Sequence, residues 1–168
     1  MTSGIAWVFP GQGSQAVGMG RDLADRYPSA RQTFDEADAA LEFSVSQLCW
    51  EGPESELTRT SNQQPAIVTV SVATLRALLA DDLLPEPDYV AGHSLGEYSA
   101  LVAAGALELG DALRLVRLRG QLMEEYGRGG MLAVIGLDEE TLQVVANESG
   151  TEVANFNAPG QMTLSGSA

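Results

Sequence analysis

The apolar residues of this chain fall into short continuous runs that alternate with helix-like repeats. The run at 5–9, which Pro10 ends, predicts a short buried strand, and residues 89–91 predict a second one. Apolar positions three and four residues apart predict helices, which we expect over residues 19–28, 30–42, 95–105 and 109–126, with shorter ones within 44–60. Strands interleaved with helices indicate a mixed α/β fold.

Residues 61–80 carry two conflicting signals. Val68, Val70 and Val72 alternate as they would in a strand. The length of the segment and Pro65, which we place in a first helical turn, favour a buried helix.

The pattern of predicted elements changes at residues 127–130, Gly-Arg-Gly-Gly. After this point we expect a strand, a helix with Asp138 as its N-cap, and two more strands, over residues 131–136, 138–148, 151–156 and 161–167, with a turn at 157–160. This β-α-β-β order is three quarters of a ferredoxin-like unit. We therefore expect two domains, 1–127 and 128–168, with an unpaired last strand, an exposed apolar face and low stability.

The pentapeptide Gly92-His93-Ser94-Leu95-Gly96 has the G-x-S-x-G pattern of a nucleophile elbow. There a strand turns sharply into a helix, the serine is strained, and the glycines avoid steric clash. The pattern alone is weak because 18 of the 168 residues are glycine, but the flanking strand-like and helix-like segments support it. We predict that Ser94 is a nucleophile and that the Leu95 amide helps to hold an oxyanion. The alternative is a plain turn with a filler serine.

A serine nucleophile needs a base, and this sequence shows no clear one. The single histidine, His93, directly precedes Ser94, and adjacent side chains in a tight turn diverge, so we interpret it as a structural or packing residue. The chain has no lysine. The base is therefore either a carboxylate or a residue beyond position 168.

Arg119 is expected to lie on an apolar helix face. Its neighbours at three and four residues are all apolar, namely Leu115, Val116, Leu122 and Met123, whereas the neighbours of Arg117 are more polar. A guanidinium in such a place needs an anionic partner because it cannot lose its proton. The partner is either an acid such as Glu97 or a substrate carboxylate held by both arms of the guanidinium.

The glycine-rich loop that begins at Gly11 has two readings. Residues 11–16 fit the dinucleotide fingerprint G-x-G-x-x-[GA]. Pro10 before the loop, the helix-weakening Gly18 and Gly20, and a helical pattern where a second strand is needed count against a nucleotide site. In a serine hydrolase, such a loop supplies the second oxyanion donor instead.

Composition narrows the function classes. Nine basic residues against 23 acidic ones give a net charge of −14, which disfavours direct nucleic-acid binding and is typical of a solvated acidic surface. We find no secretory signal and no apolar run of membrane-spanning length. The single Cys49 fits a reducing cytoplasm.

Six stretches, in order and spread over nearly the whole chain, carry a family resemblance. They are VFPGQGSQAVGMG, QPAI, AGHSLGEYSALVAAGAL, RLRGQLM, GGMLAVIGL and NFNAPGQMTLSG. Together they resemble the N-terminal part of the malonyl-CoA:acyl carrier protein transacylase family, the acyltransferases of fatty-acid and polyketide synthesis.

The resemblance implies a role for five residues. Ser94 would be the acylated nucleophile, Gln12 would shape the oxyanion hole, and the Leu95 amide would be the direct donor. Arg119 would bind the free carboxylate of a malonyl group, and Gln64 would lie near the site. It also implies an α/β-hydrolase-like larger part, malonyl-CoA and acyl carrier protein as partners, no nucleic acid, no membrane, and no cofactor or metal.

Family members continue well past residue 168 and supply a histidine base there. The resemblance therefore implies that this chain is partial and nearly inactive by itself. Two other functions stay open: an acyl-binding module without turnover, and a serine esterase that is indifferent to Arg119.

Overall fold

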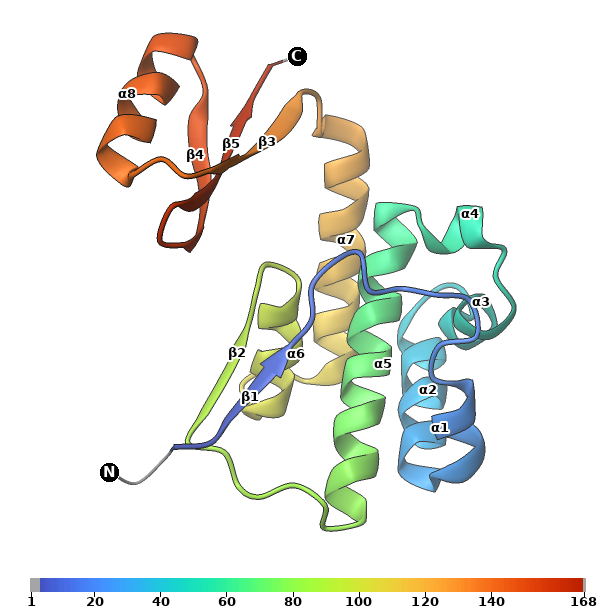
Figure 1. Cartoon of the computed structure of the whole chain (residues 1–168). Helices are drawn as coiled ribbons and strands as arrows, with labels where there is room; N and C mark the ends of the chain where they lie inside the picture. The colour runs from blue at the N-terminus through green and yellow to red at the C-terminus, as the bar shows by residue number, and fades with distance from the viewer. Residues whose placement is uncertain (1–3, 168) are drawn as a thin grey trace. The chain divides into compact units, whose positions relative to one another are not determined.

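The computed structural model describes residues 4–167 and divides into two compact units, Met1–Glu124 and Glu125–Ala168 (Figure 1). Both units combine helices with strands, so the expected mixed α/β class is confirmed. The division lies three residues before the domain boundary that the sequence predicts. Among the described residues, no helix is both long and apolar enough to cross a bilayer.

The larger unit pairs two short strands in parallel and packs helices against one of their faces. The strands are β1 (Ala6–Phe9) and β2 (Tyr89–Gly92), and Phe9 lies opposite Gly92 in the register. The helices are α1 (Arg21–Arg26), α2 (Pro28–Ala40), α3 (Val45–Glu51), α4 (Glu54–Leu57), α5 (Thr60–Ala80), α6 (Gly96–Ala103) and α7 (Leu109–Tyr126), of which α7 runs two residues past the boundary. Because parallel strands end at the same edge, the loop after β1 and the turn after β2 meet there.

Helix α5 is the centre of the larger unit and contacts α1, α2, α3, α4 and α6 (Figure 1). The helical interpretation of residues 61–80 is thus confirmed, and Val68 and Val72 belong to the buried core. The predicted position of Pro65 is wrong. Since the helix begins at Thr60, Pro65 lies in the second turn, where it cannot donate a hydrogen bond to the Ser61 carbonyl.

Helix boundaries near residue 28 also differ from the prediction. The expected helix 19–28 is shorter, because Gly20 adopts a left-handed conformation with φ +75° before α1 begins. Pro28 then starts α2 at its first position, where a missing amide hydrogen costs nothing.

The smaller unit is a three-stranded antiparallel sheet with one helix packed on it. Its elements are β3 (Gly130–Ile135), α8 (Glu139–Ser149), β4 (Glu152–Ala158) and β5 (Gln161–Gly166), and the strand order is β3-β5-β4. Its buried core consists of Leu142 and Ala146 from α8 with Met162 and Leu164 from β5. The predicted N-cap is confirmed, since the Asp138 carboxylate accepts a hydrogen bond of 2.8 Å from the Thr141 amide.

The predicted unpaired last strand is wrong. Strand β5 lies in the middle of the sheet and pairs with both neighbours, because the Pro159-Gly160 turn folds it back between them. That turn is also shorter than expected. An apolar face is exposed nevertheless: Ile135, on the outer strand β3, is 77% exposed.

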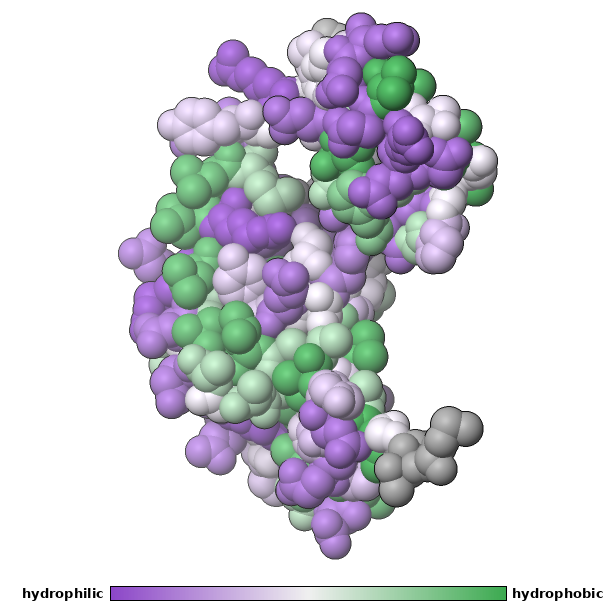
Figure 2. Space-filling model, turned by 90° about the vertical axis from the view of Figure 1, so that its left-hand side faces the viewer, coloured by the Kyte–Doolittle hydropathy of each residue, from purple (hydrophilic) through white to green (hydrophobic). Residues whose placement is uncertain are grey.

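The larger unit also leaves apolar side chains at its surface. Val8 on β1 and Tyr89 on β2 are 74% and 71% exposed, and Leu101 on α6 is partly exposed. The face with these elements shows apolar side chains among the hydrophilic ones (Figure 2). The opposite side of the two strands is covered by α6, with Phe9 and Ala100 buried between them.

Candidate active site

The turn at Ser94 has the geometry of a nucleophile elbow. Strand β2 ends at Gly92, α6 begins at Gly96, and Ser94 has a φ of +52°, which is strained for a residue other than glycine. A Cβ atom on Gly92 would overlap the Gly96 carbonyl group, and one on Gly96 would overlap the Phe9 carbonyl oxygen. Both glycines are therefore required by close backbone approach.

Two backbone amides beside the turn are available to a ligand. Leu95 is buried at the N-cap of α6, and within residues 4–167 its amide has no hydrogen-bond acceptor. The amide of Gln12, in the loop after β1, likewise has none in that part of the chain. The loop lies against the turn, since a Cβ atom on Gly11 would be 3.1 Å from the His93 carbonyl oxygen.

The side chain of Ser94 is held by Arg119 from α7. Arg119 Nη2 donates a hydrogen bond of 2.9 Å to Ser94 Oγ, and Nη1 donates one of 2.8 Å to Gln64 Oε1. Gln64 is fully buried on α5 and in turn directs Nε2 at Met123 Sδ, 3.3 Å away. The structure therefore joins three of the predicted site residues in one chain of hydrogen bonds.

The surroundings of Arg119 differ from the sequence prediction. Val116 is buried, but Leu115, Leu122 and Met123 are between 42% and 48% exposed, so the guanidinium lies at a surface edge. The alternative pairing with Glu97 is wrong. Among the described residues, no carboxylate lies within 4.0 Å of Arg119. Its positive charge is thus available next to the serine hydroxyl.

Gln12 is fixed by a residue that the sequence did not indicate. Its Nε2 donates a hydrogen bond of 2.8 Å to Oε1 of Gln63, which is buried on α5. Consecutive helical residues point about 100° apart, so Gln63 and Gln64 reach different elements from one turn. The only sequence signal was two glutamines before Pro65.

The dinucleotide reading of the loop is wrong. The loop continues in turns as far as Gly20 and no helix begins at its third fingerprint position. The segment that should form a second strand is helix α2. The helix N-terminus that would bind a pyrophosphate is therefore missing from this loop.

His93 is an exposed residue of the turn, and no hydrogen bond links its side chain to Ser94 in the described chain. The prediction that it does not act on Ser94 agrees with this geometry. The expected packing role is wrong, because an exposed side chain fills no core space.

Helix α7 approaches the beginning of α5 closely enough to place Arg119. A Cβ atom on Gly120 would lie 2.6 Å from both Ser61 Cα and the Thr60 carbonyl oxygen. One turn further, Glu124 Oε1 accepts hydrogen bonds of 2.9 and 2.8 Å from the Ser61 amide and hydroxyl. Desolvation raises the pKa of Glu124, but the Ser61 bonds and Arg59 outweigh it and lower the pKa overall.

Arg117, two residues before Arg119, contacts Asn62 and Phe43. It donates to Asn62 Oδ1 and stacks on Phe43, with 4.7 Å between the guanidinium carbon and the ring centre. Burial lowers its pKa, although Glu124 opposes this.

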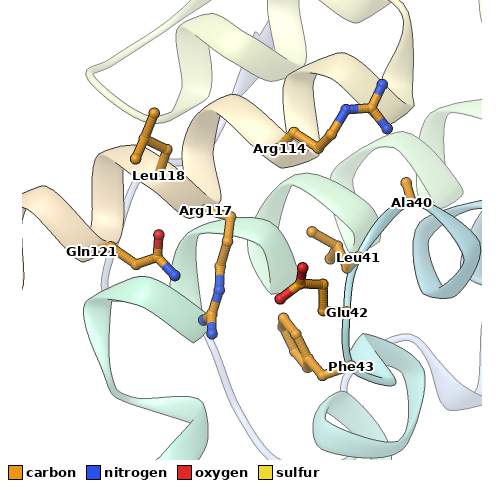
Figure 3. Close-up of a pocket in the computed structure, with 8 residues that line it drawn as sticks. All are labelled: Ala40, Leu41, Glu42, Phe43, Arg114, Arg117, Leu118 and Gln121. Atoms are coloured by element: carbon orange, nitrogen blue, oxygen red, sulfur yellow. The ribbon is translucent and has the colours of Figure 1, made fainter.

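A surface pocket of about 470 Å³ lies on this side of α7 (Figure 3). Its lining residues are Ala40, Leu41, Glu42, Phe43, Arg114, Arg117, Leu118 and Gln121. None of the predicted site residues lines it. Arg114 is already paired with Asp111 at 2.6 Å, and the negative charge of Glu42 favours the charged form of Arg117. The pocket is therefore separate from the serine site.

The fold and the strained serine between a strand and a helix define a class of mixed α/β proteins with a nucleophile-elbow turn. Within that class, a model of the acyl transferase domain family matches residues 6–168, and the chain belongs to this family.

Relatives and solved structures agree with this assignment. The malonyl CoA-acyl carrier protein transacylase of Bacillus subtilis is 49% identical, over 99% of this chain and 54% of the relative. An acyl carrier protein S-malonyltransferase from Vibrio cholerae has a TM-score of 0.90 at 44% identity, covering 98% of this chain and 56% of its own. A malonyl-transacylase solved with its type II polyketide acyl-carrier protein has a TM-score of 0.85 at 46% identity, covering 98% and 55%. The chain thus spans about half the length of these proteins.

Proposed function

We propose that this chain carries the acyl-serine site of a malonyl-CoA:acyl carrier protein transacylase of fatty-acid synthesis. Ser94 Oγ attacks the thioester carbonyl of malonyl-CoA, the new C–O bond replaces the C–S bond, and CoA leaves as the thiol with the serine proton. The phosphopantetheine thiol of acyl carrier protein then attacks the acyl-serine. A C–S bond forms, the C–O bond breaks, and the proton returns to Ser94.

The observation that carries this proposal is the 2.9 Å contact between Arg119 and Ser94 Oγ. A guanidinium at the nucleophile favours an acyl group that ends in a free carboxylate, because two parallel hydrogen bonds can form to it. A neutral ester or acetyl group offers no such partner. This favours malonyl transfer over the serine esterase alternative.

The remaining predicted roles follow from the same site. The amides of Leu95 and Gln12, which have no acceptor within residues 4–167, would stabilise the oxyanion of the tetrahedral intermediate. Gln64 holds Arg119 from the buried side. The chemistry needs no metal or cofactor, since a thioester is already activated toward acyl transfer.

We also infer the subdomain folds. The parallel pair with its elbow supports an α/β-hydrolase-like larger subdomain, which we place at residues 1–127. The order β3-β5-β4 supports a partial ferredoxin-like subdomain at 128–168, because a fourth strand would pair at β3. We place the protein in the cytoplasm, where the buried free thiol of Cys49 would stay reduced.

Mass spectrometry of the chain after incubation with malonyl-CoA tests the function. We expect a malonyl adduct on the peptide that contains Ser94, and none in Ser94→Ala. Arg119→Ala should form this adduct more slowly by about 100-fold while gaining relative tolerance for acetyl-CoA, since the lost guanidinium hydrogen bonds were specific for a carboxylate.

Turnover should stay low in this assay, because no base lies at Ser94 among residues 4–167, and loss of a triad member costs on the order of 10⁴-fold to 10⁶-fold. Equal labelling by malonyl-CoA and acetyl-CoA in both the wild type and Arg119→Ala would favour the esterase. An absence of any Ser94 adduct, even after an incubation long enough to offset this slower reaction, would favour an acyl-binding module.

A further inference from the structure

The first turn of α5 is polar and yet buried. Four consecutive side chains are at most 8% exposed: Ser61, Asn62, Gln63 and Gln64. A buried polar group is costly unless it is hydrogen-bonded, and each of the four has a partner on another segment. Three of these partners, Glu124, Arg117 and Arg119, come from α7. Gln63 alone reaches the glycine-rich loop.

The bond between Gln63 and Gln12 joins a rigid element to a weakly supported one. Gln63 belongs to a 21-residue helix at the centre of the larger unit. Gln12 is exposed in a loop without regular structure, where Gly13 adopts a φ of +97°. The other side-chain bonds of this loop, from the Gly13 amide to Gln15 and from Ser14 to the Gly11 carbonyl, are local. The 2.8 Å bond to Gln63 is thus the long-range support for the Gln12 side chain.

We propose that Gln63 is a positioning residue, which holds Gln12 so that its backbone amide stays at the oxyanion site beside Leu95. This inference rests on the proposed function. Gln63 itself does not touch the reacting atoms, and its side-chain carbonyl acts through the Gln12 amide group. Oxyanion donors work because they are in place before the reaction, so a loop free to move weakens stabilisation of the transition state more than binding of the substrate.

The test compares Gln63→Leu, which removes the acceptor, with Gln63→Glu, which keeps one. We expect the maximal rate of Ser94 malonylation to fall about 10-fold to 100-fold in Gln63→Leu, with the half-saturating malonyl-CoA concentration changed less than about twofold. Gln63→Glu should restore most of the rate. Gln47→Leu, an exposed glutamine on α3, is the matched control and should behave as the wild type.

A double-mutant cycle separates positioning from general damage. If Gln63 acts through Gln12, then Gln12→Ala combined with Gln63→Leu is no slower than Gln12→Ala alone. Multiplication of the two single effects would overturn the proposal. So would a Gln63→Leu variant that raises only the half-saturating concentration.

A spectroscopic measurement keeps this test independent of activity. In the ¹H–¹⁵N spectrum, the Gln12 side-chain amide signals should move toward those of a free glutamine in Gln63→Leu, and should stay in place in Gln47→Leu. Unchanged Gln12 signals in Gln63→Leu would overturn the positioning role, even with Ser94 labelled normally. The two proposals can also fail separately. If Gln63→Leu shifts the Gln12 signals but the wild-type chain forms no Ser94 adduct, the proposed function is refuted and the Gln63–Gln12 contact is still established.

Discussion

The elbow at residues 92–96 and the first turn of α5 at residues 61–64 both bond to Arg119, but they are built by opposite means. In the elbow, glycine lets backbone approach backbone, and the strained Ser94 presents its hydroxyl to Arg119. In the α5 turn, every residue carries a polar side chain, and each one bonds to a different partner. A larger side chain should therefore destabilise the elbow, whereas the loss of a hydrogen bond should destabilise the α5 turn.

The contrast extends to how each region depends on the rest of the chain. The elbow is set by residues within five positions and by the end of β1. The α5 turn relies on partners 51 to 63 positions away, on the glycine-rich loop and on α7. One region is a local steric device, and the other is a junction between distant segments.

Gly92→Ala should give the largest effect, because its Cβ atom would overlap the Gly96 carbonyl group in rigid backbone. We expect a loss of about 3 kcal/mol in the free energy of unfolding, measured by urea denaturation. Gly130→Ala is the matched control, since Gly130 is also a terminal residue of a strand, the first of β3, but has open space at its Cβ position. It should change stability by less than about 0.5 kcal/mol. Similar losses in the two variants would show that steric closeness does not define the elbow.

The elbow could be predicted from the sequence. Its steric requirement for glycine is met within the five residues of the G-x-S-x-G pattern, so Ser94 and Leu95 could be placed from the sequence. Asp138 was found for the same reason, since its partner Thr141 is three residues away.

The junction was not predictable, because hydrogen bonds between segments 50 or more residues apart leave no spacing pattern in a single sequence. Gln63 and Glu124 were missed in this way. Arg119 was found through its apolar neighbours, but most of these turned out to be exposed, so its placement depends more on Gly120 than on an apolar face. The middle position of β5 was missed for a related reason, as strand order is set by pairing and not by order along the chain.

Glu124→Ala should give the intermediate effect. It leaves the Ser61 amide and hydroxyl without their charged acceptor, which we expect to cost about 2 kcal/mol in the free energy of unfolding at neutral pH. The exposed ion pair with Arg59 adds little to this. Urea denaturation at pH 7 measures the loss, and Glu125→Ala, one residue along the same helix and exposed, is the control.

The pH dependence of this effect has a definite sign. Folding lowers the pKa of Glu124, so the stabilisation is complete above the unfolded pKa of about 4.3 and is lost as the pH falls through the lower folded value. The stability difference between the wild type and Glu124→Ala should therefore shrink between about pH 5 and pH 3. A difference that is constant over this range would mean that the carboxylate charge does not support the α5 turn.

Asp138→Ala should give the smallest effect, because this helix cap is local and exposed. The Thr141 amide lowers the pKa of Asp138, so this carboxylate also stabilises the fold above its unfolded pKa and ceases to do so in acid. Its loss should speed amide hydrogen exchange in the first turn of α8, while exchange in α5 is unchanged. Glu124→Ala should speed exchange in the first turn of α5 and leave α8 unchanged, because Glu124 accepts the Ser61 amide of α5, 63 positions away in sequence. If Asp138→Ala accelerated exchange in α5 as strongly as in α8, the effect of a cap would not be confined to the helix that it caps. The distinction between local and long-range hydrogen bonds would then be wrong.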